Sequence, residues 1–74
     1  MKFDVLFSRS EEIFLVKRGE EYCLVNLRQR KFKTNKEPTV FLKHGYFEDT
    51  SAEDLEPETI AAIEQVLADE RNKN

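Results

Sequence analysis

The feature that most constrains this chain is a pair of β-rich runs, 13–16 and 22–27, separated by five residues that include Gly19. Because glycine reaches positive φ without steric cost, a turn centred on Gly19 and Glu20 predicts a β-hairpin with a type II′ turn. Centring the turn on Arg18 and Gly19 would place Val16 opposite Glu21, so we favour the first register. That register sets apolar residues opposite one another: Val16 with Cys23, Leu15 with Leu24, and Phe14 with Val25.

The predicted hairpin is apolar on both faces, so both faces need cover. One face carries Phe14, Val16, Cys23 and Val25, and the other carries Ile13, Leu15, Tyr22 and Leu24. A single helix covers only one face of a sheet, and a bare second face would expose a large apolar patch to water. We therefore expect either a sheet partly curled into a barrel or, as the favoured alternative, a homodimer or other protein partner. The expected partner interface comprises Ile13, Leu15, Tyr22 and Leu24.

Alternation of apolar and polar residues over 2–8 predicts a strand that precedes the hairpin, with Phe3, Val5 and Phe7 on one face. After the hairpin, segment 28–36 is so rich in Lys and Arg that we interpret it as a solvated strand end or loop, in which Phe32 alone can point inward.

A further strand is predicted over 39–42, because Pro38 restricts Glu37 to extended geometry. His44 and Gly45 end that strand with a turn, and 46–47 is a candidate for a short final strand.

The C-terminal part of the chain predicts a single helix. Pro57 suits the first helical position, where its missing N–H costs nothing. Four apolar residues then recur at helical spacing: Ile60, Ile63, Val66 and Leu67. The sequence therefore predicts one α+β domain over 1–74, with a small, mostly antiparallel sheet of four to five strands over about 2–47. One helix over about 56–71 and a frayed tail at 72–74 complete it.

The composition excludes the usual cross-links that stabilise very small domains. Cys23 is the only cysteine and His44 the only histidine, so an intrachain disulfide and a Cys/His zinc cluster are excluded, and we expect no metal and no cofactor. No apolar run has the length of a signal-peptide core or a membrane-spanning helix, so we expect a cytoplasmic protein without membrane contact.

Charge is divided unevenly along the chain. Residues 1–47 hold ten Lys or Arg against six Asp or Glu, whereas residues 48–74 hold two against nine, which together give the net charge of -3. The basic part includes a cluster suited to phosphate contacts: Arg28, Arg30, Lys31, Lys33 and Lys36. The alternative interpretation of this cluster is a solvated sheet edge that resists aggregation.

Nothing in the sequence predicts catalysis. Cys23 lies inside a strong strand, where an inert core thiol is the usual outcome, and no His, Asn or Asp next to it in sequence could activate it. The acidic stretch 48–58 lacks the ligand spacing of a calcium loop, and acids ahead of a helix are favoured by its dipole. We expect a small non-enzymatic protein-binding or regulatory module that acts through a sheet face or edge, with nucleic-acid binding by the basic cluster as the alternative.

Overall fold

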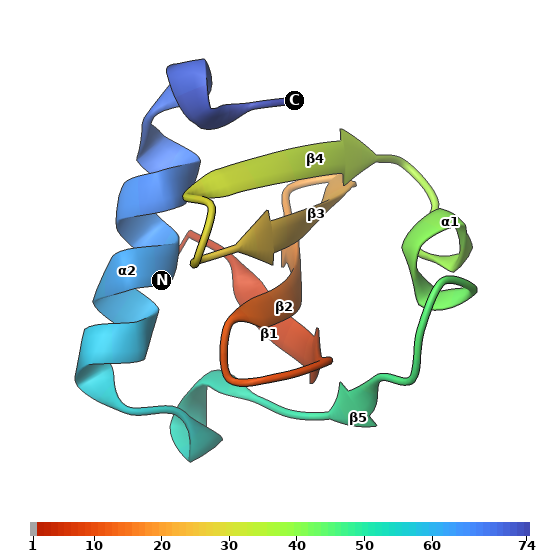
Figure 1. Cartoon of the computed structure of the whole chain (residues 1–74), viewed down its shortest axis with the longest axis horizontal. Coiled ribbons are helices and arrows are strands. Elements are labelled where there is room, and N and C mark those ends of the chain that lie inside the picture. The colour runs from red at the N-terminus through yellow and green to blue at the C-terminus, as the bar shows by residue number, and fades with distance from the viewer. Residues whose placement is uncertain (1) are drawn as a thin grey trace.

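The computed structural model describes residues 2–74 and shows a five-stranded antiparallel sheet followed by one main helix (Figure 1). The strands lie in the order β4-β3-β2-β1-β5. Their bounds are β1 Asp4–Ser8, β2 Ile13–Arg18, β3 Glu21–Asn26, β4 Lys31–Asn35 and β5 Glu48–Asp49. The helices are α1 Thr39–Leu42 and α2 Pro57–Ala68, with short 3-10 turns at Ala52–Asp54 and Glu70–Asn72. The α+β class is confirmed, and the sheet stays open rather than closing into a barrel.

The β2–β3 hairpin has the predicted register, with Leu15 opposite Leu24 and Val16 opposite Cys23. Arg18 pairs with Glu21, so only Gly19 and Glu20 form the turn. Gly19 has a φ of 64°, and positive φ at the first central position is what a type II′ turn requires.

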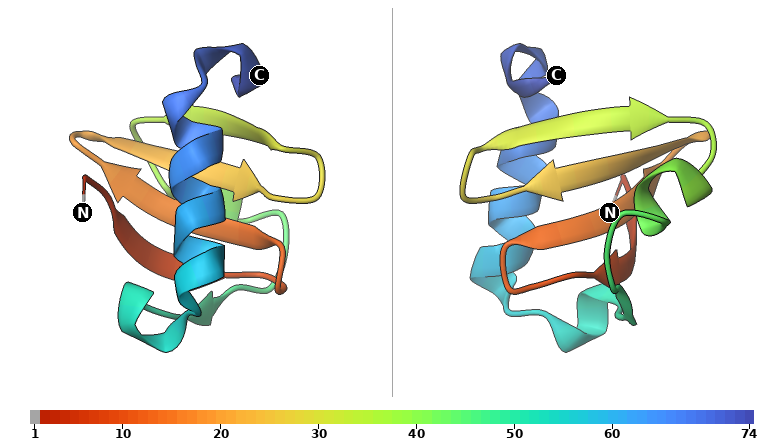
Figure 2. Two further views of the ribbon diagram at one scale, coloured as in Figure 1. Left: turned by 90° about the vertical axis from the view of Figure 1, so that its left-hand side faces the viewer. Right: turned by 45° about the vertical axis from the view of Figure 1, so that its right-hand side comes forward.

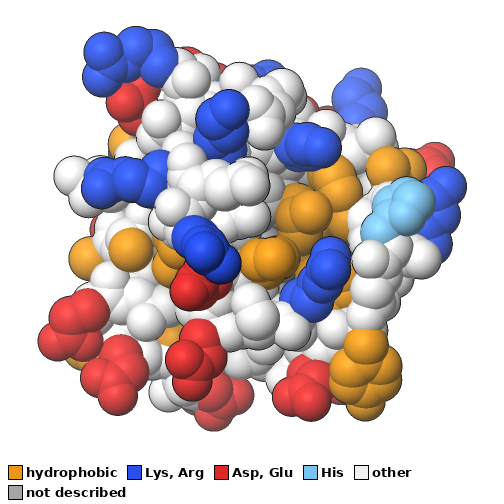
Figure 3. Space-filling model, in the orientation of Figure 1, with side chains coloured by type: hydrophobic (Ala, Val, Ile, Leu, Met, Phe, Trp, Pro, Cys, Tyr) orange, Lys and Arg blue, Asp and Glu red, His pale blue; other side chains and the backbone are white. Residues whose placement is uncertain are grey.

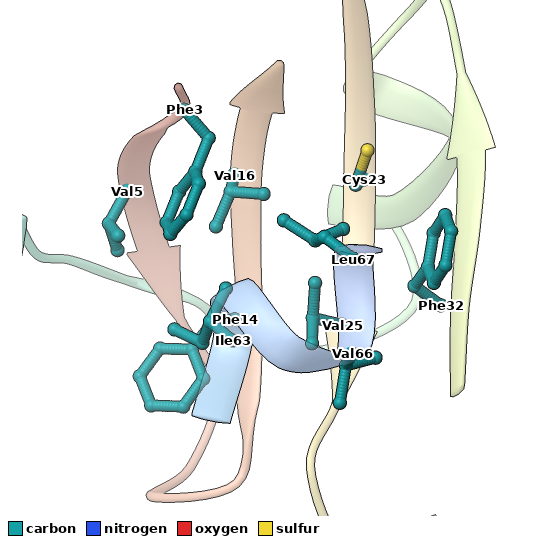
Figure 4. Close-up of a cluster of buried hydrophobic side chains, with 10 residues drawn as sticks. All are labelled: Phe3, Val5, Phe14, Val16, Cys23, Val25, Phe32, Ile63, Val66 and Leu67. Atoms are coloured by element: carbon teal, nitrogen blue, oxygen red, sulfur yellow. The ribbon is translucent and has the colours of Figure 1, made fainter. Parts of the chain in front are cut away.

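The hydrophobic core lies between α2 and one face of the sheet, which we name the closed face (Figure 4). Alternate residues of β2 and β3, with Val5 and Phe32 from the strands beside them, meet the apolar side of α2. Three helix residues complete this layer: Ile63, Val66 and Leu67. Pro57 is at the start of α2, as predicted.

The Arg18 side chain links the end of β2 to the end of α2 through a hydrogen bond and an ion pair. Its Nη1 donates a hydrogen bond to the Leu67 carbonyl oxygen at 2.9 Å, and its Nη2 lies 3.7 Å from the Glu70 carboxylate. The guanidinium also stacks 5.4 Å from the centre of the Phe32 ring. A cation at this position satisfies a carbonyl group that the helix end leaves without an intrahelical partner.

The prediction that Phe3, Val5 and Phe7 share one face is wrong at Phe7. Val5 pairs with Val16 and Phe7 pairs with Leu15, so the register shifts at Leu6 between them. Such a bulge reverses the direction of the side chains that follow it. Val5 therefore packs under α2, and Phe7 lies on the opposite face with Leu15.

Segment 31–35 forms the full strand β4 rather than a solvated strand end or loop. Strand pairing with β3 turns Phe32 into the core, where it is 1% exposed, while Lys31 and Lys33 alternate with it toward the other face. The strand was not predicted because Phe32 is the one large apolar residue at the inward positions of segment 31–35, so the alternation of apolar and polar residues is weak. After α2, Lys73 forms an isolated parallel β-bridge with Phe32 of β4. The Asn74 N–H donates a hydrogen bond to the Phe32 carbonyl oxygen at 2.9 Å.

The predicted strand at 39–42 is wrong, because this segment forms the single helical turn α1. Pro38 is itself in the right-handed helical region, with φ −71° and ψ −25°, and serves as the N-cap. The rule that restricts the residue before a proline acts on Glu37 and leaves the residues after it free to turn. The predicted short strand at 46–47 is also wrong, because these two residues are not in a strand and β5 begins only at Glu48.

The α1 turn and the segment after it lie on the side of the sheet opposite α2 (Figure 2). We name this side the open face, because one helical turn covers only part of it. Figure 2 shows the outer surfaces of β3 and β4 uncovered over most of their length.

Candidate functional site

The open face is built from alternate residues of four strands, as the strand register dictates. Three cross-strand rows form it: Phe7–Leu15–Leu24–Lys33, Asp4–Lys17–Tyr22–Asn35 and Ile13–Asn26–Lys31. Apart from Phe7 of β1, the apolar side chains therefore lie on β2 and β3, with Lys17 and Asn26 as the polar residues of those strands, and two lysines lie on the edge strand β4. This arrangement places cations directly beside apolar side chains.

The four residues of the expected partner interface all lie on the open face, but they differ in exposure. Leu15 is 0% exposed, and Phe41 of α1 is 7% exposed on the same side of the sheet. Ile13, Tyr22 and Leu24 are partly exposed. Other residues of the same chain therefore bury Leu15, whereas Ile13, Tyr22 and Leu24 stay accessible to a partner.

Figure 3 shows how side-chain types gather around this accessible part of the open face. Hydrophobic side chains form a patch near the middle of the view, beside α1, with Lys and Arg side chains around and above it. Asp and Glu side chains follow the lower margin of the same view. The surface therefore combines an apolar centre with cations on one side and anions on the other.

The five residues of the basic cluster do not share one surface. Lys31 and Lys33 project from β4 on the open face. Arg28 and Arg30 belong to the turn between β3 and β4, and Arg30 lies beside Ala62 of α2, on the closed-face side. Lys36 follows the far end of β4. The sequence cluster thus splits into a pair on strand β4 and three residues in the turns before and after it.

A shallow groove on the open face gathers cations and apolar side chains, and we name it the basic groove. It has a volume of about 170 Å³ and is lined by Arg9, Lys31 and Lys33 together with Ile13 and Leu24. Three carboxamides complete its polar lining: Asn26, Gln29 and Asn74. None of the described residues that line it is acidic. The groove therefore suits a ligand that combines negative charge with apolar surface.

A second, larger depression of about 640 Å³ lies next to the basic groove, and we name it the acidic depression. Four carboxylates line it, from three separate segments: Glu11, Glu48, Asp54 and Glu56. Tyr46 also lines it and is 80% exposed. Arg9 lines both hollows, so its side chain lies between them, and Phe14 and Thr59 place the acidic depression next to the start of α2, at the edge of the open face.

Gly45 provides the space in which the Arg9 side chain lies. A Cβ atom added at Gly45 would be 3.0 Å from Nε and 3.1 Å from Cδ of Arg9. Since that approach is closer than ordinary van der Waals contact, glycine lets the arginine pass close to the backbone. The backbone at Gly45 thus helps to place the guanidinium between the two hollows.

Sequence reasoning missed Arg9 as a binding residue and did not include Tyr46 among the expected interface residues. Arg9 stands alone between Ser8 and Ser10, and only the fold brings it beside Lys31 and Lys33. The available signal at Tyr46 was an aromatic residue next to a turn glycine, in a segment too polar to be buried.

The single cysteine and histidine are not brought together into a catalytic pair. Cys23 is fully buried in the core under α2, and this burial raises the pKa of its thiol. A raised thiol pKa lowers the thiolate fraction and hence the reactivity. His44 is exposed after α1. Among residues 2–74, no group of three or more His, Cys, Asp or Glu side chains is arranged to hold a metal ion.

Comparison with known proteins does not identify a relative: the chain matches no protein-family model, no curated protein and no solved structure. Within the part of the chain that the structure describes, neither helix has the length and apolar character needed to cross a membrane.

Proposed function

We propose that this protein is a non-enzymatic binding module whose open face docks a protein partner. The observation that carries the proposal is the partial exposure of Ile13, Tyr22 and Leu24 in the middle of a regular sheet. On the closed face, by contrast, the apolar residues of the same two strands are all buried, with an exposed fraction of 2% or less. A sheet face with accessible apolar residues is a common form of protein-binding surface.

The charges around the apolar residues support recognition of a partner that carries carboxylates. Lys31 and Lys33 flank Leu24 and Asn26 across the β3–β4 pair, and Arg9 approaches from the end of β1. Complementary charges at the rim of an interface speed association and select the partner, while the apolar centre supplies most of the affinity.

The alternative ligand, a nucleic acid, is less well supported by the open face. Single-stranded binding surfaces depend on aromatic rings on which bases stack. Tyr22 is the one ring among the partly exposed hairpin residues, and the Lys17 Nζ lies 5.7 Å from the centre of that ring. Arg30 is also separated from this surface, because it lies beside Ala62 of α2.

Site-specific photo-crosslinking in cells tests the proposal. A benzophenone amino acid replaces Tyr22 on the open face, or Gln65 on the exposed side of α2 as the matched control. We expect cross-linked protein at position 22 well above the amount at position 65, and a loss of that product when Lys33→Glu is added. Equal labelling at the two positions would contradict the proposal, and nuclease-sensitive products would favour the nucleic-acid alternative.

A further inference from the structure

The basic groove and the adjoining acidic depression together carry both halves of a charge-complementary contact. The groove is lined by three cations, and the depression by four carboxylates and one cation. Arg9 belongs to both, so the two hollows share a border. Figure 3 shows the two signs of charge on one view of the molecule, with the apolar patch between most of the cations and the lower row of anions.

A surface divided in this way is complementary to itself. Rotation by half a turn about an axis through the border between the hollows exchanges the basic and acidic sides. Two copies related by that axis then set the groove of each copy against the acidic depression of the other, which is how the isologous interfaces of two-fold dimers are built. We propose that the partner docked on the open face is a second copy of this chain, related by a two-fold axis near Arg9.

The apolar residues follow the same division. Tyr46, the most exposed large apolar side chain among the described residues, stands at the acidic depression. Ile13 and Leu24 are in the basic groove. The rotation that pairs the charges therefore brings Tyr46 of each copy toward Ile13 and Leu24 of the other. An exposed tyrosine that fills an apolar hollow is the usual kind of energetic centre in a protein interface.

A second copy fits this surface better than a purely anionic partner does. An acidic peptide or a nucleic acid complements the basic groove but, where it extends past Arg9, meets the carboxylates of the acidic depression, among them Glu11 and Glu48. Like charges at that border would oppose such a partner, whereas a second copy presents the opposite sign on each side. Self-association also stabilises a domain of this size, whose one small core contains a free cysteine and no disulfide.

This inference rests on the proposed function, and charge reversal in the purified full chain tests it. Sedimentation equilibrium should show a reversible dimer whose dissociation constant rises with salt. Lys33→Glu in the groove and Glu48→Lys in the depression should each weaken the dimer by at least about tenfold, because each change creates two like-charge contacts across the axis.

Mixing the two variants provides the decisive measurement. In a mixed dimer, the new glutamate at position 33 of one copy faces the new lysine at position 48 of the other, and the remaining wild-type side chains face each other. We expect the mixture to form a heterodimer with nearly wild-type affinity, and the double variant to dimerise with itself. Lys2→Glu and Glu64→Lys are the matched controls, since both residues line a separate depression beside α2. They should leave the dimer unchanged.

A monomer at millimolar concentration, or a dimer that the two charge reversals do not weaken, overturns the second-copy proposal. So does a mixture that fails to associate. The cross-linking experiment separates this failure from failure of the docking face. Products at position 22 that contain a different protein would keep the docking face and replace its occupant, whereas a lack of selective products would remove both.

Discussion

The two faces of the sheet are made from the same strands, yet α2 and α1 cover them to very different extents. On the closed face, a helix of 12 residues buries Val16, Cys23 and Val25 completely. On the open face, where a helix of 4 residues lies, Leu15 is buried but its neighbours Ile13 and Leu24 are partly exposed. The difference teaches that burial in this fold follows the length of the covering helix, since both faces of the hairpin are equally apolar in sequence.

The closed face should dominate stability, and Ile63→Ala tests this most strongly. Ile63 is 0% exposed at the centre of the α2 contact, so truncation removes buried surface and leaves a cavity. We expect the free energy of unfolding in urea to fall by about 3 to 4 kcal/mol. Glu64→Ala, at the exposed neighbouring position, should change it by less than about 0.5 kcal/mol. Similar losses for the two variants would show that α2 does not pack as described.

Phe41→Ala should lower the free energy of unfolding by about 2 to 3 kcal/mol, a smaller effect than Ile63→Ala despite the larger side chain. The reason is that Phe41 belongs to a single helical turn, which can shift to fill part of the space. The matched control is Val40→Ala, since Val40 is 37% exposed in the same turn. If Phe41→Ala proves as mild as this control, α1 does not cover the open face in solution.

Titration of Cys23 provides a probe of the closed face that involves no change in packing. Burial raises the pKa of the folded thiol above its ordinary value of 9.0. The unfolded chain therefore releases the thiol proton at lower pH than the folded chain does. Stability from this group is complete below pH 9.0 and is lost as the pH rises from there toward the folded pKa.

We expect the free energy of unfolding to decline in that range by up to about 1.4 kcal/mol per pH unit. Cys23→Ala should remove this part of the decline while lowering stability at pH 7. An unchanged slope in that variant would show that other groups cause the decline.

Lys33→Glu should have the smallest effect on the free energy of unfolding. Comparison with Ile63→Ala then distinguishes an open-face residue that serves binding from a closed-face residue that serves folding. Lys33 is exposed on the edge strand, and a surface substitution of this kind changes the free energy of unfolding of the monomer by about 0.5 kcal/mol or less. The measurement is urea unfolding at a concentration low enough to exclude association. A large loss of monomer stability would mean that Lys33 supports the fold and would weaken its assignment to a binding surface.

Local sequence signals accounted for much of the fold. The register of β2 and β3 followed from Gly19 and from matching apolar residues, and α2 followed from Pro57 and the spacing of Ile60 to Leu67. Segment 39–42 was misassigned because four residues carry too little periodicity to separate a strand from a helical turn. The strand β4 was missed because its one large inward residue, Phe32, stands among cations.

The candidate site was predictable only in part. Ile13, Tyr22 and Leu24 were identified from the two-faced hairpin, and all three are accessible on the open face. Arg9 could not be identified as their companion, since it lies beside Lys31 and Lys33, which are distant in the sequence, and passes close to the backbone of Gly45. The residues next to Arg9 in the sequence give no indication of either contact.

The sequence by itself determined the elements whose signals are local: a hairpin with one favoured turn and a helix with one apolar side. The tertiary structure alone decided which segment covers each face, why Leu15 is buried while Leu24 is accessible, and how cations and anions from distant segments come to adjoin. The physical reason is that turn geometry and helical periodicity act over a few residues, whereas coverage and charge grouping arise from contacts between residues far apart in the chain.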